Sequence, residues 1–134
     1  YSNKRIDYSW NKLVDHKNKS TIRKKFMTER VIEIHQNHEI LWSAIGVFYA
    51  GTRVIKHKDP DIFSDLYKRI QIPLKIPDYE KCYMTWEDGT VTNWIEGEPQ
   101  VHYVMDIAHD GCNLSDEEMI FLFLDVKKST EVEL

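Results

Sequence analysis

The sequence predicts an α+β domain in which a long N-terminal helix packs on a mainly antiparallel sheet of five or six strands. Residues 1–43 contain no glycine or proline, and apolar residues recur about every seven positions. Two later segments, Ala44–Ala50 and Met119–Val126, are apolar on both faces, as central strands are. Asp88-Gly89 separates two β-rich runs and is a strong hairpin signal.

The N-terminal segment is expected to have two parts. Residues 1–21 form a basic stalk helix, and Ile22–Leu41 turns an apolar face toward the sheet of a single α+β domain over residues 22–134. The apolar seam is interrupted by polar residues over Asp15–Lys25, which argues against a long-lived dimeric coiled coil. The first part then projects or pairs with a neighbour, so a homo-oligomer through the N-terminal helix is predicted.

The hairpin is expected over Glu80–Ile95. A two-residue turn at Asp88-Gly89 pairs Tyr83 with Trp94 and turns Cys82, Met84 and Trp86 toward the core. The remaining expected elements are a strand over Arg53–Lys58, a helix over Pro60–Arg69 capped by Asp59, an extended connector through Pro73 and Pro77, a strand over Val101–Ile107 and a polar loop over His109–Glu118.

Charge is distributed unevenly along the 134 residues, whose net charge is −4. Residues 1–58 carry 12 Lys and Arg against 5 Asp and Glu, whereas residues 59–134 carry 6 against 17. This asymmetry fits partners of opposite sign, a stalk near anionic lipid, or simply two solvated faces. Nucleic acid is excluded as a partner, because the basic helix lacks interleaved aromatic residues and the acidic part repels phosphate.

Two cysteines, Cys82 and Cys112, are too few for a disulfide framework or a zinc site. In an oxidising compartment they are candidates for a single disulfide. In a reducing compartment they are small core residues, and the sequence leaves both readings open.

Two clusters have residue types that can hold a metal ion or transfer protons. His35, His38 and Glu39 lie about one helical turn apart, and the other cluster comprises Asp106, His109, Asp110 and Cys112. Purely structural roles are favoured over a metal or catalytic site for both clusters, because His38 falls on the apolar seam of the helix and Asp110-Gly111 is an ordinary turn. The chain also lacks a phosphate-binding loop, a nucleophile elbow and a Cys-x-x-Cys motif. The sequence therefore predicts no catalytic residue, no metal ligand and no cofactor.

The segment Trp86–Gln100 contains Trp-x-Asp-Gly followed by Asn-Trp and Gly-Glu-Pro, and it resembles the calcium-site stretch of C-type lectins. The resemblance implies that Glu98 is a calcium ligand and that Gln100 stands at a sugar-selecting position. The family's Trp-Asn-Asp motif and its framework cysteines are missing here. A small-molecule or glycan-binding domain is therefore the alternative function.

A second resemblance spans the chain. The order of long helix, central strand, hairpin and terminal strands is similar to GAF and PAS sensor domains. The segments Pro99–Met105 and Cys112–Asp116, followed by an apolar last strand, resemble the end of the soluble extracytoplasmic domain of T-even-type bacteriophage holins. This implies a non-enzymatic regulatory head that binds an antiholin or a signal and sets the time of host lysis. It also implies a membrane anchor before Tyr1 and a periplasmic location.

One departure from this resemblance concerns Lys4 and Arg5, because basic residues beside a membrane anchor favour the cytoplasmic side.

The expected partner surface is the exposed side of the hairpin together with the acidic loop, because aromatic side chains ringed by charge are good anchors. Its residues are Tyr83, Trp94, Asp110, Asp116 and Glu117. The alternative is that the short helix over Pro60–Arg69 covers this side.

Overall fold

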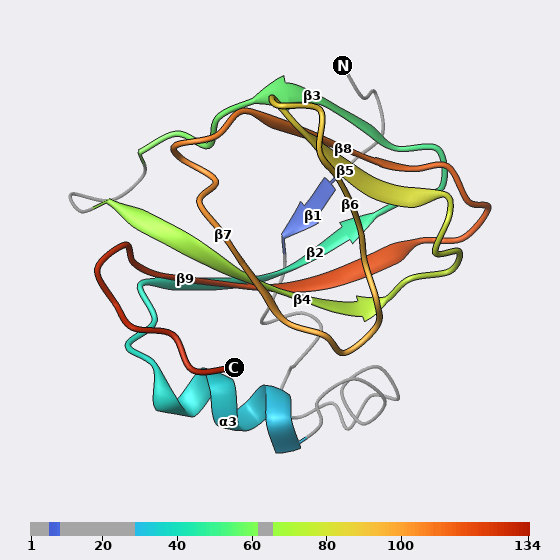
Figure 1. The fold of residues 1–134 in the computed structure, drawn as a ribbon. Coiled ribbons are helices and arrows are strands. Elements are labelled where there is room, and N and C mark those ends of the chain that lie inside the picture. Colours follow the sequence, from blue (N-terminus) through green and yellow to red (C-terminus); the bar gives the residue numbers. More distant parts are fainter. Residues whose placement is uncertain (1–5, 9–28, 62–65) are drawn as a thin grey trace.

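A computed structural model describes residues 6–8, 29–61 and 66–134. Within these ranges the chain is mostly β-structure with one helix (Figure 1). The described elements are β1 (Ile6–Tyr8), α3 (Glu29–Asn37), β2 (Trp42–Phe48), β3 (Arg53–His57), β4 (Tyr67–Lys75), β5 (Cys82–Trp86), β6 (Val91–Asn93), β7 (Gln100–His102), β8 (His109–Asn113) and β9 (Met119–Lys127).

Two antiparallel sheets form a sandwich. Sheet A has the strand order β1-β2-β9-β4-β7, and sheet B has the order β3-β8-β5-β6. The apolar side chains between the sheets are mostly aromatic or sulfur-containing, and Phe121 stacks on Phe123 and meets Trp94 edge to face. This cluster comprises Phe48, Cys82, Met84, Trp94, Met119, Phe121 and Phe123.

The outer face of sheet A is covered by α3, whose Val31 and Ile34 are buried on it. Aliphatic residues on alternate positions of the central strands complete this second core, which follows from the two-residue period of a strand. Figure 1 shows α3 beneath the sandwich with the C-terminus beside it. His38 links the two, because its Nδ1–H donates to the Ile34 carbonyl (2.6 Å) and its Nε2 accepts the amide of Glu133 (3.1 Å).

The predicted fold class is wrong: the structure is a two-sheet sandwich and not a long helix on one sheet of GAF or PAS type. The stalk helix over residues 1–21 lies mostly outside the described residues, and its described part, Ile6–Tyr8, is a strand. Of the predicted helix Ile22–Leu41, residues 29–37 are helical. Apolar spacing alone could not reveal that Ile6–Tyr8 pairs with β2, because that contact joins segments forty residues apart in the chain.

Three further local predictions are wrong. The predicted helix over Pro60–Arg69 does not reach Arg69, because strand β4 begins at Tyr67. Residues 62–65 of that segment are outside the described ranges. The connector at Pro73 is part of the same strand, where the ladder register shifts between Pro73 and Lys75, as a bulge allows. The loop over His109–Glu118 begins with strand β8, and the predicted strand over Val101–Ile107 continues only to His102.

The hairpin is confirmed as an element, but its register differs from the prediction by one residue. Tyr83 pairs with Asn93, and Thr85 pairs with Val91. The turn is longer than two residues, because the amide of Trp86 donates to the carbonyl of Thr90 (2.8 Å). Gly89 has a φ of 88°, as the last residue of a three-residue hairpin loop requires. The shift moves Trp94 to the inner face.

Candidate metal centre

The end of β3 and the start of β8 bring two histidines together. His57 and His109 are paired across the ladder, and Trp86 pairs with His109 on its other side. Residues paired directly across strands share one face of a sheet. Asp59 follows two residues after His57, and its amide donates to the carbonyl of Val104 (2.9 Å), so backbone contacts fix its position.

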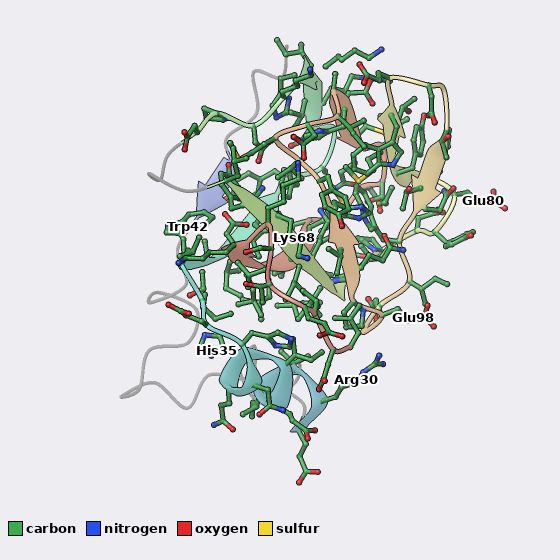
Figure 2. All side chains as sticks on the ribbon, turned by 60° about the vertical axis from the view of Figure 1, so that its left-hand side comes forward. Arg30, His35, Trp42, Lys68, Glu80 and Glu98 are labelled. Atoms are coloured by element: carbon green, nitrogen blue, oxygen red, sulfur yellow. The ribbon has the colours of Figure 1, made fainter. Side chains whose placement is uncertain are left out.

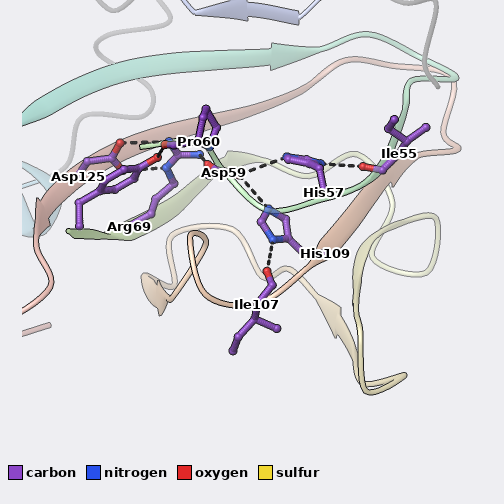
Figure 3. A network of polar contacts seen from close by, with 9 residues as sticks. Ile55, His57, Asp59, Pro60, Arg69, Ile107, His109 and Asp125 are labelled. Carbon is purple, nitrogen blue, oxygen red and sulfur yellow. Dashed lines mark hydrogen bonds and ion pairs between the residues drawn. The ribbon is translucent and has the colours of Figure 1, made fainter. Parts of the chain in front are cut away.

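The three side chains converge on one point (Figure 3). Nε2 of His57 and Nε2 of His109 each lie 3.2 Å from Oδ1 of Asp59. The candidate ligand atoms of His57, Asp59 and His109 all lie within 4.8 Å of one another. Among residues 29–61 and 66–134, these three form the one group of His, Cys, Asp or Glu side chains that could hold a metal ion. Side chains of Asp59 and His109 are 10% and 8% exposed, while that of His57 is 39% exposed. The site is therefore enclosed except on the His57 side.

The tautomers of both imidazoles are set by backbone carbonyls. Nδ1 of His57 lies 2.7 Å from the carbonyl of Ile55, and Nδ1 of His109 lies 2.8 Å from that of Ile107. Since a carbonyl oxygen only accepts, both Nδ1 atoms carry hydrogen. In the neutral rings both Nε2 atoms then present lone pairs to a carboxylate oxygen. Three hydrogen-bond acceptor atoms therefore lie close together, and a proton or a metal cation between them is needed to offset the repulsion of their lone pairs.

The charge of the surroundings favours a cation. Oδ2 of Asp59 also forms an ion pair with Arg69 Nη1 (3.1 Å), and Arg69 is paired with the fully buried Asp125. Two carboxylates therefore face one guanidinium. Burial alone would raise the pKa of Asp59, but the hydrogen bond with His109 and the charge of Arg69 outweigh it and lower that pKa. Burial alone would lower the pKa of His109, but Asp59 and the Ile107 carbonyl raise it.

The donor set fits a divalent transition metal. Two ligand atoms about 2.1 Å from one ion, at angles of about 90–110°, lie roughly 3.0–3.4 Å apart, and both Nε2–Oδ1 separations fall in that range. Imidazole nitrogens suit zinc, iron, nickel and copper, while a calcium site consists of oxygen atoms. The Nδ1 contacts to carbonyls are also typical of histidine ligands in metal sites. His57, Asp59 and His109 would hold such an ion.

One residue of the predicted partner surface, Trp94, is buried, and the others lie on β5, on β8 and in the segment before β9. Trp94 is 3% exposed and donates Nε1–H to Gln71 Oε1 (2.9 Å), whereas Tyr83 lies on the outer face of β5 opposite Cys112. Asp110 is on β8 and accepts a hydrogen bond from the amide of Thr85 (3.2 Å). Asp116 and Glu117 are exposed before β9, and Glu117 lies 3.6 Å from Lys75 Nζ. Binding of a partner by these residues remains a prediction.

Cys82 and Cys112 are free, buried thiols in the structure. Cys82 pairs with Asn113 and Tyr83 pairs with Cys112, so the two thiols point to opposite faces of sheet B. Cys82 donates to Asn113 Oδ1 at 3.4 Å within the inner core.

The other candidate clusters are separated. His35 and His38 lie on and after α3, which packs on the outer face of sheet A, and Asp106 is paired with Lys128 (2.8 Å). The lectin-like Glu98 is exposed and points away from the sandwich (Figure 2), while Gln100 Oε1 accepts a hydrogen bond from His102 (3.0 Å). His109 is the residue of these clusters that belongs to the site.

The sequence patterns do not predict His57 and Asp59 as site residues, because Asp59 before Pro60 also suits a helix cap. The signal was available, because two metal-ligand residues spaced i and i+2 at the end of a strand fall on one face. Their meeting with His109, fifty residues later, depends on the pairing of β3 with β8.

Several solved structures have a fold similar to this two-sheet sandwich. A cupin protein from Bacteroides fragilis is similar with a TM-score of 0.50 and 19% identity, over 69% of this chain and 70% of that one. A cupin domain from Bordetella pertussis has a TM-score of 0.50 and 15% identity, over 68% and 85% of the two chains. The fold is cupin-like.

A structure described as that of DMSP lyases is also similar, with a TM-score of 0.48 and 11% identity, and this chain spans 42% of its length. No protein-family model matches the sequence, and no curated protein matches it.

These findings correct the predicted identity. The resemblance to phage holins and to GAF or PAS domains is wrong, because the similar structures are cupins, and the inferred role in host lysis is withdrawn with it. The exclusion of an enzyme and of metal ligands is also withdrawn, because His57, Asp59 and His109 form a group of metal-ligand type in the structure. No described helix is long and apolar enough to cross a bilayer. The anchor before Tyr1, the periplasmic location, the homo-oligomer and the protein partner remain predictions.

Proposed function

We propose that this cupin-like domain binds one divalent first-row transition metal through His57, Asp59 and His109 and is a metal-dependent enzyme. The observation that carries the proposal is the meeting of two imidazole lone pairs with one carboxylate oxygen, each nitrogen 3.2 Å from that oxygen. Two histidines and one carboxylate are the donor set of non-haem iron oxygenases, which leave further coordination positions open. Oxygenase chemistry on a small organic molecule is the reaction class that this donor set favours.

The chain's own residues have separate roles in this proposal. The carbonyls of Ile55 and Ile107 hold the imidazole rings so that Nε2 points inward. Asp59 supplies the negative charge that a divalent cation needs, and the exposed side of His57 gives access from solvent. A metal ion bound there would supply Lewis-acid activation at the positions that the protein leaves open.

Titration with Co²⁺ tests the proposal, because this ion reports its coordination by visible absorption. Calorimetry on the metal-free protein is expected to show one site, with a d–d spectrum that changes when azide is added to an open coordination position. His57→Ala, Asp59→Asn and His109→Gln should each abolish this binding. His35→Gln is the matched control, because it removes a histidine from α3 and should leave the titration unchanged.

Two results would contradict the proposal. Binding that is equally strong in all three variants would assign the metal to other residues. A wild-type protein that binds no Co²⁺, Zn²⁺ or Fe²⁺ would show that the three residues form only a buried ion pair, in which a proton on His109 balances Asp59.

A further inference from the structure

Behind Asp59 lies a second carboxylate, connected to it by one guanidinium. Arg69 binds Asp125 through two hydrogen bonds, Nε to Oδ1 at 2.8 Å and Nη2 to Oδ2 at 3.1 Å. Its third nitrogen, Nη1, lies 3.1 Å from Oδ2 of Asp59 (Figure 3). The planar fork of the guanidinium therefore serves both acids at once, with each nitrogen assigned to one oxygen.

The guanidinium is fixed by the sheet beneath it. Asp125 on β9 pairs directly with Trp42 on β2 and with Arg69 on β4, and Arg69 pairs with His102 on β7. These four residues form one row across the inner face of sheet A. The carbon Cζ of Arg69 lies 4.7 Å from the ring centre of Phe123 and 5.8 Å from that of Trp42. Aromatic rings and hydrogen bonds together leave the guanidinium little freedom.

This arrangement gives the two oxygens of Asp59 different partners. Oδ2 lies 3.1 Å from Arg69 Nη1, whereas Oδ1 lies 3.2 Å from Nε2 of both His57 and His109. The neighbouring backbone is held as well, because the hydroxyl of Tyr67 donates to the carbonyl of Pro60 (2.9 Å). If the carboxylate turned to offer both oxygens to an ion, its contact with Arg69 would lengthen.

We propose that Arg69, held by Asp125, is a positioning residue that restricts Asp59 to donation through one oxygen and thereby selects transition metals over Ca²⁺. This proposal rests on the metal site proposed above. Calcium takes six to eight oxygen ligands and often binds carboxylates through both oxygens, so a carboxylate limited to one oxygen suits it poorly. A transition metal needs only one oxygen beside the two imidazole nitrogens.

The effect is one of orientation and not of charge. Arg69 and Asp125 have opposite charges in direct contact, so together they change the local potential little. Arg69→Lys keeps the positive charge but lacks the fork that can bind both acids, and it therefore isolates the geometric role. Asp125→Asn removes the charge that holds the fork in place.

The experiment measures the affinities for Co²⁺ and Ca²⁺ in the wild-type protein and in Arg69→Lys and Asp125→Asn. We expect the ratio of the two affinities to fall by about 10- to 100-fold in both variants, the size of effect that outer partners of metal ligands have. The Co²⁺ spectrum should also change. Loss of charge alone would weaken both ions together and leave the ratio as it was. Lys75→Met is the control, because it removes an ion pair with Glu118 elsewhere in the molecule.

A measurement on the wild-type protein avoids dependence on folding of the variants. The infrared difference spectrum upon Zn²⁺ binding, with Asp59→Asn as reference, should show the widely split carboxylate stretches of single-oxygen coordination. Narrow splitting from a two-oxygen carboxylate would overturn the proposal, as would an unchanged affinity ratio and Co²⁺ spectrum in folded Arg69→Lys. A wild-type protein without metal binding would instead refute the proposed function.

Discussion

Asp59 and His109 can either form an ion pair with each other or bind a metal ion, and the pH determines which of the two is favoured. As an ion pair they stabilise the metal-free fold, since the pKa of Asp59 is lowered and that of His109 is raised. The contribution of Asp59 is present above about pH 4 and is lost as pH falls through its lowered pKa. The contribution of His109 is present below about pH 6.5 and is lost as pH rises through its raised pKa. A metal ion needs His109 unprotonated, so it competes with the proton of this pair.

Affinity for Co²⁺ is therefore expected to rise with pH and to level off only above the raised pKa of His109. Each bound ion should displace about one proton at pH 6.5. Calorimetry in two buffers of different ionisation enthalpy counts that proton. An affinity that is constant from pH 6 to pH 8 would place the metal away from His109.

His102 offers a second pH effect at the scale of one residue. Burial, together with the charges of His109 and Arg69, lowers its pKa from 6.5 to about 4. The unfolded chain then binds more protons than the folded one between these values, so the wild-type protein loses stability as pH falls from 6.5 to 4. We expect His102→Gln to remove roughly 1–3 kcal/mol of this loss. Urea unfolding of both proteins at pH 7 and pH 4.5 measures it, and parallel losses would contradict the expectation.

At the scale of elements, α3 stabilises sheet A from the side opposite the metal site. Ile34 is 4% exposed on this helix, whereas its neighbour Ile32 is 37% exposed. Ile34→Ala should lower the free energy of unfolding by about 2–4 kcal/mol, and Ile32→Ala by less than about 0.5 kcal/mol. Because α3 contributes no candidate ligand, Co²⁺ stoichiometry should be unchanged in both. Denaturant titration and calorimetry test the two statements, and loss of the metal in Ile34→Ala would contradict the second.

The elements also show how far local patterns go. The strands at Ala44–Ala50 and Met119–Val126 and the hairpin signal at Asp88-Gly89 were correctly predicted, because each has a strong pattern of its own. Strand β4 was not predicted although Ile70, Ile72 and Leu74 alternate along it, since Pro73 by itself indicates a connector. Strand β8 was not predicted because Asp110-Gly111 also suits a turn. In the structure Asp110 and Gly111 are part of this strand, and the ring of Trp94 packs next to Gly111.

For the whole molecule, what the sequence could not provide was the meeting of distant segments. His57 and His109 are ordinary residues in their own neighbourhoods, and only the pairing of β3 with β8 makes them a pair. Likewise Arg69 and Asp125 become partners through the β4–β9 ladder. A site assembled from two sheets has no local signature apart from the spacing of His57 and Asp59.

The same construction predicts how a metal acts on the molecule as a whole. His109 belongs to sheet B, and Asp59 is held by Arg69 of sheet A, so an ion at the site joins both layers of the sandwich. An ion that binds only the folded chain stabilises it by about 2.7 kcal/mol at a free concentration 100 times its Kd. Thermal unfolding should therefore shift upward with Co²⁺ and return with a chelator, whereas Asp59→Asn should not respond. A wild-type transition that is unchanged at saturating Co²⁺ would show that the ion does not prefer the folded state.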